Sequence, residues 1–304
     1  MRIMVTGCRG QVGWELTRSL AVLGEVVACD RSTADLASPA SLRATVERLR
    51  PDVIVNAAAY TMVDKAEDEE ALAATINADA VGALAQASRD VGALFVHFST
   101  EYVFDGAKPG AYVEDDPPSP VNAYGRSKLA GERAVADAGG DWLVFRTSWV
   151  YAARGKNFLR TMLRLASERE TLRVVADQVG APTSARMIAE VSAHIVRQAM
   201  AERLNGRFES GLFHLTAAGS TTWHGFASRI VEAARAMLPS GAIATRAIEA
   251  IATSEYPTPA RRPANSLLDN GMFEQRFGLR RAPWDESLQL VLEEIIEQGG
   301  WRAQ

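Results

Sequence analysis

Short apolar segments alternate with amphipathic segments along the first half of the chain, and this alternation constrains the fold more than any other feature. The apolar segments are bounded by Gly, Asp, Asn or Ser and lack a polar face. Buried parallel strands have this composition, because helices cover both faces of their sheet. The pattern predicts strands at residues 2–5, 26–29, 53–56, 94–98 and 143–145, and helices at 12–23, 41–49, 72–91 and 124–138. We therefore expect an α/β fold with a Rossmann-like, doubly wound parallel sheet.

The regular alternation ends near residue 150. Beyond it, the spacing predicts helices over residues 157–169, 185–200, 222–237 and 287–298, and strands over 172–175 and 211–215. This less regular half is typical of a smaller, mixed α/β lobe that binds substrate. We expect a dinucleotide-binding domain over residues 1–150 and a mainly substrate-binding domain over 151–304, allowing for a return of the chain to the first domain around 171–200.

Composition excludes several classes of function. The 304 residues contain 33 Lys and Arg and 37 Asp and Glu, a net charge of −4, which argues against nucleic-acid and membrane-surface partners. The two cysteines exclude a disulfide framework and suit a reducing compartment. No apolar run approaches the ~20 residues that a membrane-spanning helix needs. We therefore expect a cytoplasmic enzyme.

Three glycines lie where the first predicted strand gives way to the first predicted helix, in the spacing Gly-x-x-Gly-x-x-Gly. Gly7 permits a tight turn, Gly10 allows a close approach of the backbone to a pyrophosphate, and Gly13 lets the helix pack against the sheet. The N-terminus of the helix offers free N–H groups to phosphate oxygens. Such a loop is by itself weak evidence, since an ordinary strand–helix turn can also contain three glycines.

An acidic residue at the end of the second predicted strand strengthens the case for a dinucleotide. Asp30 follows Gly10 by 20 residues, where a carboxylate binds the adenosine ribose; the alternative is a turn or helix-capping residue. Arg31 could instead bind the 2′-phosphate of NADPH, so both NADH and NADPH remain candidates. Asp35 and Leu36 are candidates for the adenine pocket, and the small side chains after residue 56 would allow the backbone to lie against the cofactor.

Tyr124 and Lys128 lie four residues apart on a predicted helix, so their side chains share one face. A phenol with a pKa near ~10 is a poor acid–base catalyst at neutral pH, and a neighbouring ammonium would bring that pKa closer to the working range. Spacing alone equally fits a pair on the helix surface. Ser99 and Thr100, at the end of the preceding strand, favour catalysis because a hydroxyl there can hold a substrate oxygen beside the tyrosine. The reaction that these groups support is carbonyl reduction, with hydride from nicotinamide and a proton from Tyr124.

The glycine spacing and Tyr-x-x-x-Lys resemble the extended short-chain dehydrogenase/reductase family. Within that family, the chain resembles most the dTDP-4-dehydrorhamnose reductases, from residue 1 to about residue 290. Four segments carry this closer resemblance: 55–61, 99–104, 146–151 and 256–263. The resemblance implies reduction of the 4-keto group of a dTDP-sugar, dTDP-4-dehydro-L-rhamnose, in dTDP-L-rhamnose synthesis. It also implies catalytic roles for Tyr124, Lys128 and Thr100, substrate contacts at Thr100, Glu101 and Trp149, and cofactor contacts at Gly10, Gln11, Val12, Asp30, Asp35, Leu36, Ala59, Tyr60 and Thr61.

The sequence departs from the resemblance at one position. Some members of the family hold a magnesium ion at a dimer interface through glutamates, and Glu15 and either Glu293 or Glu294 match two of those positions. Arg186 stands where a third glutamate is expected. Because a cation there would repel the metal, we expect no metal at this site, pairing of Arg186 with Glu15, and a monomer or a homodimer without a metal bridge.

Two other functions remain open. A nucleotide-sugar epimerase or dehydratase would use the same fold and tyrosine but recycle its NAD, although Glu101 alone matches only part of the acidic pattern of dehydratases. A non-catalytic NAD(P)-binding regulatory subunit is the other alternative, against which the presence of Thr100, Tyr124 and Lys128 argues.

Overall fold

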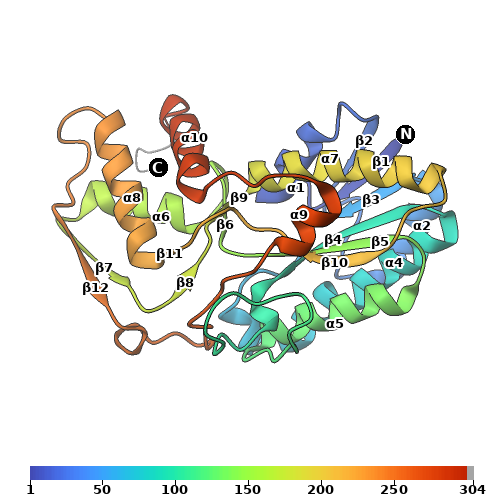
Figure 1. Ribbon diagram of the computed structural model, residues 1–304, viewed down its shortest axis with the longest axis horizontal. Helices are drawn as coiled ribbons and strands as arrows, with labels where there is room; N and C mark the ends of the chain where they lie inside the picture. Colours follow the sequence, from blue (N-terminus) through green and yellow to red (C-terminus); the bar gives the residue numbers. More distant parts are fainter. Residues whose placement is uncertain (300–304) are drawn as a thin grey trace.

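The computed structural model describes residues 1–299. Its central feature is a parallel sheet of six strands, which Figure 1 shows within the larger lobe. The strand order is β10-β5-β4-β3-β1-β2. The strands are β1 (Arg2–Thr6), β2 (Glu25–Cys29), β3 (Val53–Asn56), β4 (Leu94–Thr100), β5 (Trp142–Thr147) and β10 (Gly211–His214). The α/β, doubly wound fold expected from the sequence is thus confirmed, and its first five strands lie where the apolar segments predicted them.

The strand order reverses at β1, because β2 pairs with one side of β1 and β3 with the other. Ligands of open α/β sheets bind at such a reversal, outside the carboxyl ends of the strands. The register aligns Thr6 at the end of β1 with Asn56 at the end of β3. The glycine-rich segment and residues 57–61 therefore emerge side by side at this edge.

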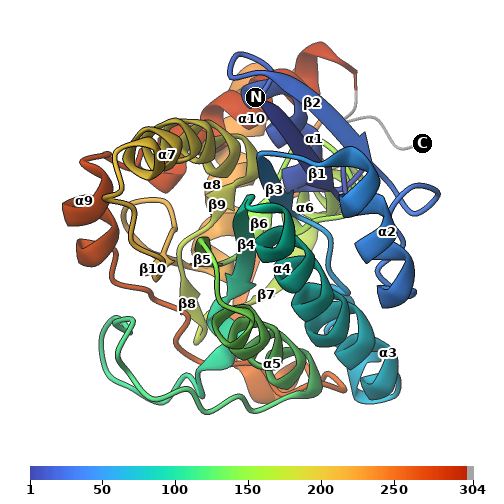
Figure 2. The same ribbon diagram turned by 90° about the vertical axis from the view of Figure 1, so that its right-hand side faces the viewer.

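Helices cover both faces of the sheet, as Figure 2 shows end-on. On one face, α1 (Gln11–Ser19), α7 (Ala185–Leu204) and α9 (Gly271–Phe277) bury their apolar side chains against residues such as Val5, Val55 and Phe145. The other face packs against α2 (Pro39–Leu49), α3 (Glu70–Ala74), α4 (Ala80–Val91) and α5 (Ala123–Ala138), with Met4, Ile54 and Phe95 in the core. Burial on both faces explains why these strands read as continuous apolar runs.

A second lobe has its own apolar core. It contains α6 (Phe158–Glu168), α8 (Trp223–Met237), α10 (Trp284–Glu297) and the parallel pair β7 (Thr171–Val175) and β12 (Ala247–Ile251). Two short parallel strands, β6 (Val150–Tyr151) and β9 (Thr183–Ser184), lie between the lobes (Figure 1). A third pair, β8 (Val179–Gly180) and β11 (Thr221–Thr222), is antiparallel. Within residues 1–299, no helix combines the length and apolar character needed to cross a lipid bilayer.

Three details differ from the sequence-based expectation. The single helix expected over residues 72–91 is interrupted by a π-helical turn at Thr75–Asp79, where the Asn77 side chain bonds to residues outside its helix. The strand at 172–175, within the range allowed for a return to the first domain, pairs with β12 and not with the main sheet. Helix α7, which begins in the same range, packs in the core of the sheet lobe, and β10 then joins the sheet. Helix α9 and the short strands were not expected, since segments of two to seven residues carry little periodicity.

Candidate active site

The glycine-rich loop has the backbone geometry that its glycines require. Gly7 adopts φ +65°, and a Cβ atom there would lie 2.8 Å from the backbone of Ala58, so the loop closes tightly on the segment after β3. A Cβ atom on Gly13 would lie 2.1 Å from the carbonyl oxygen of Gly7. Helix α1 begins at Gln11, and its N-cap residue, Gly10, makes no side-chain hydrogen bond to the N–H groups of the first turn. These donors are available to an anion.

Asp30 directly follows β2 beside this loop, and its carboxylate is already surrounded by donors. It accepts hydrogen bonds from the backbone N–H and the hydroxyl of Ser32, at 2.9 and 2.6 Å, and pairs with Arg9 at 2.6 Å. The Ser32 hydrogen bonds in particular hold the pKa of Asp30 below its usual value. Arg9 thus places a guanidinium group beside the carboxylate expected to bind the adenosine ribose, and the side chain of Arg31, the next residue in sequence, is exposed.

Asp35 and Leu36 lie in the turn before α2 and face different surroundings. The Asp35 carboxylate accepts the backbone N–H of Ala37 at 3.0 Å, which closes the turn. Leu36 is buried with Leu42 and Val46 in the core between the sheet and helices α2 to α5. In this structure, both residues stabilise the local fold.

Residues 59–61 follow β3 and are fixed in place by the π-helical turn. The Asn77 side chain accepts the backbone N–H of Tyr60 at 2.8 Å and donates to its carbonyl oxygen at 3.0 Å. The Tyr60 hydroxyl donates to Glu69 at 2.5 Å, and burial together with this carboxylate raises the pKa of Tyr60 to about 12. Ala59 is half-buried and Thr61 is exposed. Asn77 is a residue that the sequence analysis missed, because nothing in the pattern marks a π-helical turn.

Thr100 and Tyr124 are brought together although they belong to different elements. Thr100 is the last residue of β4, whereas Tyr124 lies in the first turn of α5, which begins where Asn122 caps the N–H of Gly125 at 2.8 Å. Burial and the nearby Glu101 raise the pKa of Tyr124, while a hydrogen bond with the Thr100 hydroxyl opposes that rise. The sequence predicted a lowered pKa; the structure shows the opposite direction, because the strongest influences on the phenol are burial and a carboxylate.

Glu101 is buried directly behind Thr100. The Thr100 hydroxyl donates to its carboxylate at 2.8 Å, and burial raises the pKa of Glu101 to about 7. A protonated Glu101 can donate to Thr100, which leaves the threonine hydroxyl free to donate elsewhere. The charge on Glu101 therefore controls which donors this site can offer.

Lys128 is almost fully buried, with 1% of its surface exposed, and its Nζ atom points toward β4. Nζ lies 2.7 Å from the carbonyl oxygen of Phe98 and 3.1 Å from Nε2 of His97. Burial lowers the pKa of Lys128 to about 8. Side chains alternate across a strand, so His97 and Ser99 both face α5.

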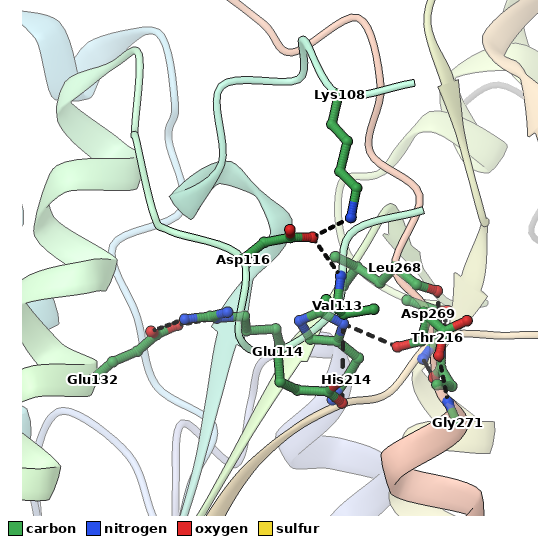
Figure 3. A network of polar contacts seen from close by, with 12 residues as sticks. Lys108, Val113, Glu114, Asp116, Glu132, His214, Thr216, Leu268, Asp269 and Gly271 are labelled. Atoms are coloured by element: carbon green, nitrogen blue, oxygen red, sulfur yellow. Dashed lines mark hydrogen bonds and ion pairs between the residues drawn. The ribbon is translucent and has the colours of Figure 1, made fainter. Parts of the chain in front are cut away.

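One turn further along α5, Glu132 takes part in a different kind of network. It accepts the Ser99 hydroxyl at 2.5 Å and forms a bidentate pair with Arg146 of β5 at 2.9 and 2.7 Å. Figure 3 shows Glu132 on one side of the network, with Glu114 and His214 on the other. The Glu114 carboxylate accepts the backbone N–H of His214 at 2.8 Å. The network ties the segment before α5 to the edge of the sheet.

Trp149 follows β5 and has an unusual backbone conformation for a non-glycine residue, with φ +46°. Its indole stacks on Trp223 of α8 with the ring centroids 3.6 Å apart. Trp223 Nε1 donates to Gln178 at 3.1 Å, which fixes the second ring. The sequence analysis had noted Trp149 but not Trp223, since the two residues meet only in the folded chain.

The proline-rich loop over residues 256–263 is anchored by an ion pair. Arg262 donates to both oxygens of Asp64, at 3.0 and 2.8 Å. The Asn122 amide also donates to the carbonyl oxygen of Arg261, at 2.8 Å. This loop is thereby held against the segment after β3 and the N-terminus of α5.

Arg186 occupies the position at which a metal-binding glutamate was expected. Its guanidinium lies 2.5 Å from Glu294 and 3.9 Å from Glu15, which is buried. The predicted pairing with Glu15 is thus confirmed, and Glu294 is the closer partner. The guanidinium stands where a third oxygen ligand would be needed and offsets one negative charge, so the three residues do not fit a divalent cation. Within residues 1–299, no group of three or more His, Cys, Asp or Glu side chains is arranged to hold a metal ion.

Comparison with known proteins places this geometry in a family. The model of the RmlD substrate binding domain matches residues 1–297. A dTDP-4-dehydrorhamnose reductase of Burkholderia thailandensis is 57% identical over 98% of this chain and all of its own length. A dTDP-4-dehydrorhamnose reductase structure from Clostridium acetobutylicum superposes with a TM-score of 0.87 at 35% identity, covering 97% of this chain and 100% of its own. The Bacillus anthracis enzyme, solved with NADP, gives a TM-score of 0.85 at 34% identity, covering 96% and 99%. The chain belongs to the dTDP-4-dehydrorhamnose reductase family.

Proposed function

We propose that this protein reduces the 4-keto group of dTDP-4-dehydro-L-rhamnose to the alcohol of dTDP-L-rhamnose, with NADH or NADPH as reductant. The cofactor supplies a hydride from C4 of its nicotinamide to the carbonyl carbon. Tyr124 donates a proton to the carbonyl oxygen. The observation that carries the proposal is the meeting of Thr100 and Tyr124 beside the edge where the glycine-rich loop emerges.

The protonation states of the site suit reduction. A phenol with a raised pKa is neutral at physiological pH and so holds the proton that reduction requires. Thr100 orients the carbonyl oxygen through its hydroxyl. This donation is available when Glu101 is protonated, since the hydroxyl otherwise donates to the Glu101 carboxylate at 2.8 Å.

The loop geometry supports binding of the cofactor by the sheet lobe and of the dTDP-sugar near the second lobe. Residues 7–13 and 59–61 would hold the diphosphate and nicotinamide ribose, Asp30 the adenosine ribose, and Asp35 and Leu36 the wall of the adenine pocket. Lys128 would bind the nicotinamide ribose. The second lobe, with Glu101 and the Trp149–Trp223 pair near the junction, would bind the dTDP-sugar.

The decisive experiment supplies the dTDP-4-keto sugar with NADH or NADPH and follows both absorbance at the reduced-nicotinamide band and the identity of the product. Stoichiometric oxidation with formation of dTDP-L-rhamnose is expected. Conversion of the sugar without net oxidation would instead identify an epimerase or dehydratase that recycles its cofactor. Cofactor binding without conversion of any dTDP-4-keto sugar would identify a regulatory subunit.

A further inference from the structure

The amino group of Lys128 lies in surroundings that carry little opposing charge. Its two contacts are the Phe98 carbonyl and the His97 ring. Glu132, on its own helix, is the other titratable group acting on it, and that carboxylate is already paired with Arg146 of β5 and bonded to Ser99. Among the ion pairs of residues 1–299, none includes Lys128. The protonation state of this amine therefore depends on whether Nε2 of His97 carries a proton.

Asn56 determines which nitrogen of His97 carries the proton. The Asn56 amide oxygen accepts the backbone N–H of Ala58 at 3.3 Å and the hydroxyl of Thr6 at 2.5 Å. Because a backbone N–H can only donate, this contact fixes the oxygen on that side of the amide. The amide nitrogen therefore faces Nδ1 of His97, at 3.0 Å, and donates to it.

With Nδ1 as acceptor, the neutral imidazole carries its proton on Nε2, directed at Nζ of Lys128. His97 is fully buried, and burial holds its pKa well below the usual value, so the ring stays neutral. An ammonium at Nζ would bring two donors face to face. An uncharged amine can accept from Nε2 and donate to the Phe98 carbonyl, which suits both contacts of Nζ.

We propose that His97, with its tautomer fixed by Asn56, is a positioning residue that holds Lys128 in its uncharged form in this arrangement and so sets the upper pH limit of activity. The kinetic part rests on the proposed function, in which Lys128 contributes as an ammonium. The structural part, the tautomer and the titration of Lys128, does not. The two parts can therefore fail separately.

The structural part is tested by nitrogen-15 NMR of the full chain labelled at histidine. With four histidines, the spectrum is simple, and a His97→Leu variant assigns the signal of interest. His214 is an internal reference of the opposite tautomer, since its Nδ1 lies 2.9 Å from the Asp269 carbonyl oxygen and must donate to it. We expect His97 to be protonated on Nε2. Protonation on Nδ1 in the unsubstituted protein would overturn the proposal.

Asn56→Asp reverses the tautomer with almost no change in size. A carboxylate at position 56 still accepts from Ala58 and Thr6, but toward His97 it can only accept, so the ring proton moves to Nδ1. Nε2 then accepts from an ammonium at Lys128. We expect the pH midpoint of the Lys128 side chain, followed by carbon-13 NMR of the four lysines and assigned with Lys128→Met, to rise by at least one pH unit, a tenfold gain in proton affinity. An unchanged midpoint after a confirmed change of tautomer would refute the proposal.

Because a new buried carboxylate could also raise that midpoint by charge alone, Asn56→Asp is combined with His97→Leu. In this double variant, the carboxylate remains but the imidazole no longer transmits its effect. We expect most of the rise to disappear. A rise of the same size with and without His97 would assign the effect to charge and refute the role of the ring.

The kinetic part is read from the pH dependence of kcat/KM for the dTDP-4-keto sugar. We expect the alkaline limb of the Asn56→Asp profile to move to higher pH by the same amount as the Lys128 midpoint. His97→Gln, which keeps a polar group near Nζ, is expected to retain more of kcat than His97→Leu. If no turnover is observed, the proposed function fails while the NMR results still decide the role of His97. An alkaline limb that stays fixed while Lys128 shifts would show that His97 does not set the pH limit.

Discussion

Two successive turns of α5 bury ionisable side chains against the same strand, yet they are built on opposite principles. Glu132 is matched by a guanidinium at 2.7 Å, so its charge is compensated. Lys128 is matched by a carbonyl oxygen and a neutral ring, so its charge is not. The difference teaches that a compensated buried charge holds elements together, whereas an uncompensated one is available for chemistry. The predictions below test this contrast.

The largest effect is expected at the first turn of the helix. Tyr124→Phe removes the general acid and should lower kcat by about 10²–10⁴-fold, while cofactor binding and thermal stability stay close to those of the unsubstituted protein. Tyr102→Phe is the matched control, since its ring packs edge-on against Tyr124 with centroids 5.4 Å apart. Turnover of Tyr124→Phe within a few fold of normal would remove the phenol from the mechanism.

Breaking the ion pair between Glu132 and Arg146 should lower the stability of the fold. Arg146→Met leaves the Glu132 carboxylate buried without its partner, and we expect the free energy of unfolding in urea to fall by about 3–5 kcal/mol. The double variant Arg146→Met/Glu132→Leu removes both charges and should recover a large part of that loss. A loss below about 1 kcal/mol in the single variant would mean that this pair does not stabilise the fold.

Glu101 is a second buried group without a charged partner among residues 1–299, and its effect on stability should depend on pH. Its pKa is about 7 in the folded protein against an ordinary 4.5, so between these values the folded state keeps a proton that the unfolded state has lost. The free energy of unfolding therefore falls as pH rises through this window, by about 3 kcal/mol in total. Glu101→Gln cannot ionise and should escape this fall. Parallel stability curves for the two proteins between pH 4.5 and 7.5 would contradict the raised pKa.

The smallest effect concerns Arg186, which pairs with two carboxylates at the position where other members of the family would hold a metal ion. Addition of EDTA or of magnesium should leave the activity, melting temperature and elution volume unchanged. Arg186→Glu, which restores the third carboxylate, provides a comparison in which magnesium should raise the melting temperature. A chelator-dependent loss of stability in the unsubstituted protein would show that a metal binds despite the arginine.

The sheet lobe could be predicted closely because burial on both faces leaves an unmistakable apolar signature. Strands β1 to β5 lie within two residues of their predicted bounds at each end. Strand β12, with the sequence Ala-Ile-Glu-Ala-Ile and mostly exposed, carries no such signature. The strand order and the return of the chain through β10 depend on contacts between distant segments.

In the candidate site, too, the sequence predicted local features but not contacts between distant residues. Motif spacing found the residues whose backbone or spacing is local, such as Gly7, Gly13 and the pair Tyr124 and Lys128. It did not show that Lys128 turns toward His97, because that contact joins residues 31 apart in sequence. It also gave the wrong direction for the pKa of Tyr124, since burial and the approach of Glu101 are properties of the folded chain.

The joint between the lobes includes one side chain that serves both. Asn157 caps α6 by accepting the backbone N–H of Arg160 at 3.1 Å, and its amide nitrogen donates to Gln11 in the first turn of α1 at 2.9 Å. The start of the second lobe is thus hydrogen-bonded to a residue of the glycine-rich loop. The same amide nitrogen also donates to the carbonyl oxygens of Ala152 and Arg154, so a ligand that displaces Gln11 would break the link between the lobes and leave the cap of α6 in place.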